Sequence, residues 1–442
     1  MNGSFQEFPS GKLIRILSER SKQSSALHRQ FLQLRQNGLQ NTKTLIELQL
    51  KSQALPGFRD THSALRRVLF DGPQLEEFGT GKISNCLGPA FAVYDHRRMP
   101  RIPNGDLRMM SRITAVEGRL RDFNHPASIT AEYDVPADGW FLQNGDPTNL
   151  PCSIVMEIAL QPCGFLSAYL DTYALLPDGD FYFRNLDGTL NRVGAVDVRC
   201  KTIVTRAKLI SSVVSGGTAI QKFSFELTCE GKTLYRGESV FGYFPAHVMA
   251  NQVGLDGGQK VLPWLKTLPD RLAAGRMTAA SRWMPSPGSR AGLSLTPGRM
   301  NFLEDVYVSP TGGRFGKGYV YAGQPVDPQA WYFPYHFYQD PVMPGSLGIE
   351  AVLEAVKIWA LENHAAAGMR SPHFVTSAGE PAMTWRYRGQ ITRQNRLMEL
   401  EFHLKEIKRG AGQITLLGDA SLWVDGLRIY EVMNAAVGIQ EG

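Results

Sequence analysis

Several features that would define a class of protein are scarce or missing in this sequence. Five cysteines occur in 442 residues, without a CxxC pair and without histidines at metal-ligand spacing, at Cys86, Cys152, Cys163, Cys200 and Cys229. An odd, scattered set of this kind argues against a disulfide framework and against a zinc site. No uninterrupted apolar run approaches the ~18 residues that a bilayer-spanning helix needs. The N-terminal stretch also lacks the apolar segment of a secretory signal, so we expect a soluble, cytoplasmic chain without a bound metal.

Concentrated charge is missing as well. Lys and Arg number 47 against 41 Asp and Glu, which gives a net charge of +6, and the basic residues are dispersed rather than interleaved with aromatic residues. This distribution disfavours nucleic acid as a partner, and the lack of a spanning segment disfavours a membrane. The modest positive charge suits an acidic protein partner. Apolar residues make up 43% and charged residues 20% of the chain, as in ordinary globular proteins.

The length of the chain suits two domains of roughly 150–200 residues each. Near the N-terminus, Leu27, Phe31 and Leu34 follow a roughly helical spacing among glutamines. Strand-like runs begin after this segment, and a stretch that becomes rich in Pro, Gly and Ser separates two such regions. The predicted organisation is an N-terminal helical linker or docking segment, a first domain, a linker and a second domain, at residues 1–70, 71–260, 261–297 and 298–442.

The two predicted domains share a weak internal repeat. Residues 131–170 match residues 322–361 in the order V-[PD]-x-x-x-W-[FY], D-P, P-x-S-[IL] and then E. Each copy leads a strand through a proline corner into a long apolar helix, and the two corner prolines, Pro151 and Pro344, lie 193 positions apart. Each copy also ends in a predicted hairpin whose turn is Glu-Gly or Asp-Gly, in the sequences EGKTLY and DGLRIY.

The helix of the first copy, LPCSIVMEIALQPCGFLSAYL, is apolar nearly all round, so other elements must cover it on every side. A strongly curved antiparallel sheet wrapped around the helix would provide that cover. Two such units side by side would form one continuous sheet with two buried helices. The predicted fold class is therefore α+β.

The second copy resembles a known family. Residues 312–352 contain the ordered pattern H-F-x-x-D-P-V-M-P-G-x-L-G and resemble the active-site stretch of the bacterial beta-hydroxydecanoyl-acyl carrier protein dehydratase, a hot-dog-fold enzyme. The first copy, PCSIVMEIALQPCGFLSAYL, resembles the dehydratase regions of polyunsaturated fatty acid synthases, which are iterative polyketide-type enzymes with two tandem hot dogs. The resemblance covers about residues 75–440 and implies a double hot dog.

The resemblance implies removal of water from 3-hydroxyacyl chains to give trans-2-enoyl thioesters, in polyunsaturated fatty acid or polyketide biosynthesis. This elimination needs a base for the C2 proton, an acid for the 3-hydroxyl and a dipole for the thioester oxygen. His336 is the candidate base, because an imidazole accepts protons near neutral pH. Gly345, at the start of a helix, would offer its N–H to the thioester oxygen, and a side chain there would crowd the thioester.

The implied acid is a carboxylate of the partner unit, which corresponds to Glu157 of the first copy. Gln161 follows four residues later and matches an amide that supports this carboxylate, because residues i and i+4 share a helix face. The second copy has Glu350 and Glu354 at these places, and two neighbouring carboxylates would repel each other. Glu350 is either left over from a lost site or a supporting residue, and the sequence leaves both interpretations open.

The first copy departs from the pattern where its own base and glycine should lie. Counting from the aligned residues leads to Gln143 or Gly145 in place of the histidine, and Cys152 replaces the glycine. The span from Trp140 to Pro151 is also two residues shorter than its counterpart in the second copy. We therefore expect one active site per chain, to which the first hot dog contributes the carboxylate and the second contributes the histidine.

The resemblance implies no cofactor, because the substrate is carried on the phosphopantetheine of an acyl carrier protein. Expected partners are this carrier and other domains or subunits of a synthase, and a homodimer is a further candidate. Two other functions remain open: a non-catalytic acyl-binding scaffold and a hot-dog thioesterase. The sequence also leaves open the chain length of the substrate and whether the double bond is moved from trans-2 to cis-3.

Overall fold

Residues Arg66–Gly442 form one compact unit. A computed structural model describes residues 68–442 except 143–149, 270–274, 285–292, 296 and 377–380. The predicted N-terminal helical segment therefore lies almost wholly outside the described residues.

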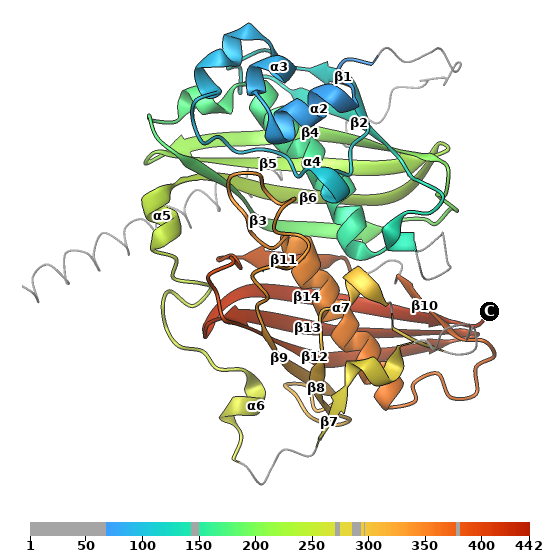
Figure 1. The fold of residues 1–442 in the computed structure, drawn as a ribbon. Helices are drawn as coiled ribbons and strands as arrows, with labels where there is room; N and C mark the ends of the chain where they lie inside the picture. Colours follow the sequence, from blue (N-terminus) through green and yellow to red (C-terminus); the bar gives the residue numbers. More distant parts are fainter. Residues whose placement is uncertain (1–67, 143–149, 270–274, 285–292, 296, 377–380) are drawn as a thin grey trace, which may run out of the picture. The chain divides into compact units, whose positions relative to one another are not determined.

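Among the described residues, the helices are a few short ones and two long ones, α4 and α7, of 18 residues each. The α-helices are α2 (Gly72–Thr80), α3 (Ile83–Leu87), α4 (Cys152–Tyr169), α5 (Ala246–Ala250), α6 (Trp264–Thr267) and α7 (Gly345–Glu362). Short 3-10 turns are η1 (Pro89–Tyr94), η2 (Gly105–Leu107), η3 (Trp140–Leu142), η4 (Thr172–Leu175), η5 (Ala280–Trp283) and η6 (Gly298–Met300). Figure 1 shows α4 and α7 each lying against its own set of strands.

The strands form one continuous antiparallel sheet. The first copy supplies β1 (Arg112–Glu117), β2 (Ala127–Asp134), β3 (Phe181–Arg192), β4 (Thr202–Ser215), β5 (Thr218–Cys229) and β6 (Lys232–Pro245). The rest are β7 (Arg276–Ala279), β8 (Asp305–Ser309), β9 (Tyr319–Pro325), β10 (His373–Thr376), β11 (Met383–Tyr387), β12 (Leu397–Gly410), β13 (Gln413–Val424) and β14 (Leu427–Gln440). Their order is β1-β2-β4-β5-β6-β3-β11-β14-β13-β12-β9-β8-β7, with β10 paired to β14.

The pairing of β3 with β11 joins the two copies, with Leu190 opposite Met383 and Asp187 opposite Arg386. Each copy wraps its part of the sheet around one long helix. The prediction of an α+β double hot dog with a continuous sheet and two buried helices is confirmed.

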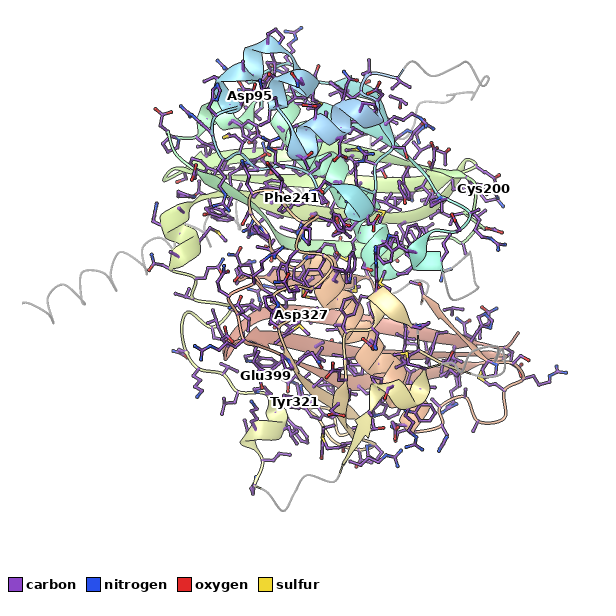
Figure 2. The ribbon with its side chains drawn as sticks, in the orientation of Figure 1. Asp95, Cys200, Phe241, Tyr321, Asp327 and Glu399 are labelled. Carbon is purple, nitrogen blue, oxygen red and sulfur yellow. The ribbon has the colours of Figure 1, made fainter. Side chains whose placement is uncertain are left out.

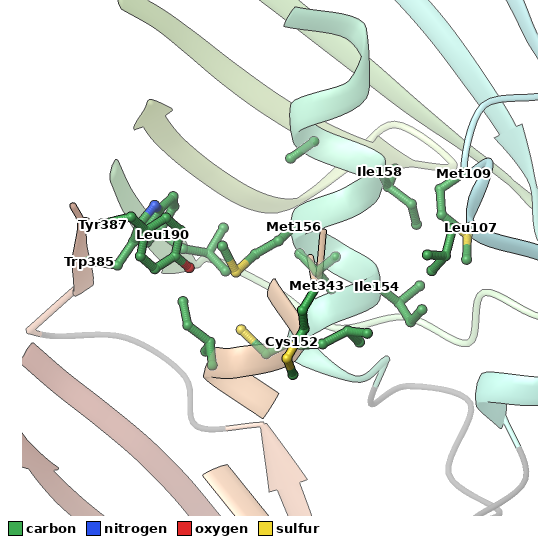
Figure 3. Packing of buried hydrophobic residues seen from close by; sticks show 14 of the residues in the cluster. Leu107, Met109, Cys152, Ile154, Met156, Ile158, Leu190, Met343, Trp385 and Tyr387 are labelled. Atoms are coloured by element: carbon green, nitrogen blue, oxygen red, sulfur yellow. The ribbon is translucent and has the colours of Figure 1, made fainter. Parts of the chain in front are cut away.

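The central helix α4 is buried on several sides, as its apolar sequence predicts (Figure 3). By length and composition it could cross a membrane, but 83% of it is covered by the rest of the structure. Pro162 lies inside this helix and has no N–H to donate to the carbonyl of Ile158. The hydroxyl of Thr205 on β4 donates to that carbonyl instead, over 3.1 Å, so the buried acceptor keeps a partner.

The internal repeat is confirmed by the ends of matching elements. Pro151 and Pro344 precede α4 and α7 directly, as predicted. The β5–β6 and β13–β14 hairpins turn at Glu230–Gly231 and at Asp425–Gly426, and all four residues have positive φ. Such angles are those of the type I′ turn that Asp-Gly favours. The turns η2 and η6 also lie 193 positions apart, a part of the repeat that the sequence pattern did not reveal.

Residues from matching positions meet where the two copies join. Trp140 and Trp331 pack edge to face with ring centroids 5.0 Å apart. The guanidinium of Arg299 lies 5.4 Å and 5.2 Å from these two rings and forms an ion pair with Asp106 at 2.5 Å. Asp106 and Arg299 are themselves 193 positions apart, so the contact relates equivalent residues of the two copies.

The segment predicted as a linker, 261–297, also contributes to the second hot dog, because its strand β7 pairs with β8. Its helix α6 covers two buried carboxylates on β12. The Trp264 N–H donates to Glu401 over 2.6 Å, and Lys266 pairs with Glu399. The Tyr321 hydroxyl also donates to Glu399, and these two residues lie close together in Figure 2.

Candidate active site

A cavity of about 100 Å³ lies at the start of α7 and is lined by residues of both copies. The four residues predicted from the sequence, His336, Glu157, Gly345 and Gln161, all line this cavity. The structure therefore brings the imidazole of the second copy and the carboxylate of the first copy to one space. Two of the four come from the first copy and two from the second.

His336 lies in the segment between β9 and α7, and its ring is partly buried. The imidazole stacks on Phe337, with ring centroids 3.9 Å apart, and the peptide bond between the two residues is cis. Its Nδ1 lies 3.2 Å from the carbonyl oxygen of Val342. A carbonyl can only accept, so Nδ1 carries the proton and Nε2 keeps its lone pair.

Removal from water disfavours the charged form of the His336 imidazole. Burial lowers its pKa to about 3, although the hydrogen bond to Val342 acts in the opposite direction. The charge of Arg184 lowers this pKa further. The ring is therefore neutral at physiological pH and can accept a proton at Nε2.

Glu157 lies on α4, and only 7% of the residue is exposed. The hydroxyl of Ser346 donates to its Oε1 over 2.6 Å, and the Gln161 amide donates to its Oε2 over 3.0 Å. Burial raises the pKa of Glu157, while these two hydrogen bonds act in the opposite direction. The net shift favours the protonated carboxyl, which is the form a general acid needs.

Gln161 is held in place by three hydrogen bonds. Besides Glu157, its Nε2 donates to the carbonyl of Leu107 over 2.7 Å, and its Oε1 accepts from the Met109 N–H over 2.9 Å. The contact with Glu157 is the one that the i to i+4 spacing predicted. Because both ends of the amide are bound, Gln161 has one orientation, with its N–H toward the carboxyl.

Gly345 is the first residue of α7, where backbone N–H groups have no partner within the helix. The Tyr387 hydroxyl donates to the Gly345 carbonyl over 3.1 Å. A Cβ added to Gly345 would lie 2.6 Å from Cε2 of the same tyrosine. The ring of Tyr387, rather than the thioester that we expected, is thus the neighbour in this structure that a side chain would meet.

Sequence reasoning missed Ser346. This residue is 3% exposed, follows Gly345 in α7 and joins the second copy to the carboxyl of the first. Its counterpart Ser153 in α4 donates from both N and Oγ to Oε2 of Glu350, over 3.1 Å and 3.2 Å. The repeat carried a signal for this, because both copies have serine directly after the residue that opens the helix.

The equivalent place in the first copy holds a second cavity of about 100 Å³, lined by Cys152, Tyr235 and Leu353 among others. These three residues correspond to Gly345, Tyr430 and Leu160 of the first cavity. Residues 143–149, which include both positions counted for a first base, lie outside the described residues. Burial raises the pKa of the Cys152 thiol, so the nucleophilic thiolate is disfavoured.

The glutamates of α7 at the matching positions, Glu350 and Glu354, have different contacts from Glu157 and Gln161. Lys357 lies 3.6 Å from Oε1 of Glu350, which also binds Ser153 through its other oxygen. Burial raises the pKa of Glu354 to about 8, and the nearby charge of Glu350 acts in the same direction. Glu354 accepts a hydrogen bond from the Phe302 N–H over 2.8 Å. The second copy thus replaces the amide of Gln161 by a carboxyl that favours its neutral form.

A family model matches part of the chain. Residues 295–433 match the FabA-like domain. The chain is 34% identical over 389 residues to one of the polyunsaturated fatty acid synthase subunits of Thraustochytrium sp. (strain ATCC 26185 / S-3). This match covers 83% of the chain but 26% of the relative, so the chain spans about a quarter of that protein's length.

Two solved structures align with most of this chain at low sequence identity. The dehydratase domain from the CurJ module of curacin polyketide synthase is 11% identical, with a TM-score of 0.40, and the match covers 76% of this chain and 98% of that one. The 12:0-ACP thioesterase from Umbellularia californica is 13% identical, with a TM-score of 0.35, and the match covers 71% of this chain and 94% of that one.

Proposed function

We propose that this chain, whose residues 295–433 form a FabA-like domain, removes water from 3-hydroxyacyl thioesters carried on the phosphopantetheine of an acyl carrier protein. The product is the trans-2-enoyl thioester. The relative from Thraustochytrium sp., named as part of a synthase, supports a setting in polyunsaturated fatty acid synthesis, with other synthase domains as partners.

The proposed reaction uses one group for each requirement. Nε2 of His336 takes the C2 proton, and the electron pair of the broken C–H bond forms the C2–C3 double bond. Glu157 gives its proton to the 3-hydroxyl, which leaves as water. The Gly345 N–H, at the positive end of α7, binds the thioester oxygen as negative charge develops there. His336 ends protonated and Glu157 ends ionised, and one proton returned from the imidazole to the carboxyl restores both.

The shared cavity is the observation that carries this proposal. Two groups whose pKa values are shifted in opposite directions, His336 downward and Glu157 upward, line the same space. A base and an acid that differ in this way suit a reaction in which one proton is removed and another is supplied.

Product analysis tests the proposal against its alternatives. The chain is incubated with a 3-hydroxyacyl carrier protein, and the carrier-bound product is weighed by mass spectrometry. We expect a loss of about 18 Da, the mass of one water, with wild type and with His247→Ala, which changes an exposed histidine of α5, but not with His336→Ala. Equal rates for wild type and His336→Ala would support the scaffold, and release of free acid would support a thioesterase. Chromatography of the enoyl product would show whether the double bond moves to cis-3.

A further inference from the structure

We propose that Arg184 and Arg98 of the first copy position the catalytic imidazole by holding Asp340, the acidic residue of the loop that carries His336. This inference rests on the proposed function. It assigns the first hot dog a second contribution to the site, besides the carboxylate of Glu157. In this role the arginines are positioning residues, because their contacts hold Asp340 in the loop and not the imidazole itself. Arg184 also lines the cavity, and its charge acts on the imidazole as well.

The loop from His336 to Val342 is short and closed by its own hydrogen bonds. Phe337 and Asp340 exchange N–H to carbonyl bonds of 3.2 Å in both directions. The Val342 N–H donates to the His336 carbonyl over 2.8 Å, and the Val342 carbonyl accepts from the imidazole. Asp340 lies two residues before Val342. A shift of Asp340 would therefore move the carbonyl that orients the ring.

An arginine of the first copy binds the Asp340 carboxylate in a bidentate manner. Arg184 of β3 donates from Nη1 to Oδ2 over 2.5 Å and from Nη2 to Oδ1 over 2.9 Å. Arg98 adds a contact of 3.3 Å to Oδ1. The side chains of Arg184 and Asp340 are only 12% and 18% exposed, so solvent screens this pair less than a surface ion pair. Paired bonds between guanidinium and carboxylate also fix orientation as well as distance.

Both arginines are themselves fixed. Arg184 donates from Nε to the side-chain oxygen of Gln390 over 2.5 Å and from Nη1 to the Phe183 carbonyl over 2.8 Å. Arg98 donates to the Tyr182 hydroxyl over 2.7 Å, and its guanidinium lies 4.3 Å from the centroid of that ring. Other contacts therefore hold in place the side chains that bind the Asp340 carboxylate. Through Asp340, these side chains restrict the position of the loop.

The test compares variants of the Arg184–Asp340 ion pair with a variant of another bidentate ion pair, Arg112–Asp134. Arg184→Gln, Asp340→Asn and the double variant are assayed for kcat and KM with the 3-hydroxyacyl carrier protein. Arg184→Lys serves as a second variant that keeps the charge but cannot bind both oxygens. Arg112→Gln is the control, because Arg112 binds both oxygens of Asp134, over 2.6 Å and 2.9 Å, and does not line the cavity.

We expect Arg184→Gln and Asp340→Asn each to lower kcat by roughly 10-fold to 100-fold, the range for a displaced catalytic group, with little change in KM. The double variant should be no worse than either single variant, because both changes remove the same contact. Arg112→Gln should leave kcat near that of wild type. The proposal is overturned if the cluster variants resemble Arg112→Gln, or if the losses of the two single variants multiply.

A second readout does not depend on dehydratase activity. Hydrogen exchange of the amides of Phe337, Asp340 and Val342 should be faster in Arg184→Gln and Asp340→Asn than in wild type, and unchanged in Arg112→Gln. If wild type shows no dehydration, the proposed function fails, and exchange still decides whether the cluster holds the loop. Unchanged exchange overturns the inference, and so does faster exchange combined with unchanged kcat.

Discussion

Replacing His336 by asparagine should change the pH dependence of folding stability in a defined direction. The unfolded chain binds a proton at this imidazole below about pH 6.5, whereas burial in the folded chain lowers the pKa to about 3. The folded state therefore loses stability, relative to the unfolded state, as the pH falls from 6.5 towards 3. Asparagine cannot bind the proton but can still donate from Nδ2 to the Val342 carbonyl.

The size of this change in folding stability follows from the size of the pKa shift of His336. At about 1.36 kcal/mol per pH unit, the interval from pH 6.5 to pH 5 corresponds to about 2 kcal/mol. Solvent contact of the partly buried ring reduces this value, so we expect about 1–2 kcal/mol. The free energy of unfolding of His336→Asn, minus that of wild type, should be more positive at pH 5 than at pH 7.5 by this amount.

Urea unfolding of wild type and His336→Asn at the two pH values measures this difference. His247→Asn is the control, because it removes an exposed imidazole from α5. If the difference between His336→Asn and wild type is the same at pH 5 and at pH 7.5, the imidazole is not held neutral by burial. His336 would then not be a neutral base at physiological pH.

Three further substitutions test single contacts of the structure. Gly345→Ala should destabilise the fold by about 1–3 kcal/mol in urea unfolding, because its Cβ meets the Tyr387 ring, and unchanged stability would contradict this contact. Ser346→Ala removes a hydrogen-bond donor to the carboxylate of Glu157, the proposed acid, so the pKa of Glu157 should rise. The alkaline limb of the pH–rate profile should then move to higher pH, and a shift to lower pH would contradict this. Thr205→Val leaves the buried Ile158 carbonyl without its donor and should cost about 1–3 kcal/mol, again by urea unfolding, whereas a loss below about 0.5 kcal/mol would contradict it.

The fold could be predicted from local patterns. The sequence predicted the proline corners at Pro151 and Pro344 and the apolar helices that follow them. It also predicted the two hairpin turns at Glu-Gly and Asp-Gly, and the structure contains all of these features. The placement of His336 near Glu157 came from the motif and from the family resemblance, since nothing in the spacing alone joins residues 179 positions apart.

The contacts that surround the site were not predictable in the same way. Ser346 with the carboxyl of α4, Tyr387 beside Gly345, and Arg184 with Asp340 all join residues that only the folded sheet brings together. Their residue types are common on protein surfaces, and among them only Ser346 had a signal in the sequence, through its match with Ser153 in the repeat. Helix α6 was likewise interpreted as part of a linker, because the buried carboxylates that it covers lie more than a hundred positions away.

We propose that the first copy supplies the acid through Glu157, and that the equivalent Glu350 of the second copy does not act as an acid. The most direct measurement compares single-turnover dehydration rates of Glu157→Gln and Glu350→Gln, two changes of the same kind on equivalent helices. We predict that Glu157→Gln lowers the rate by roughly 100-fold to 10,000-fold, the range for loss of a general acid, and that Glu350→Gln stays near wild type. A larger loss in Glu350→Gln than in Glu157→Gln would contradict the account.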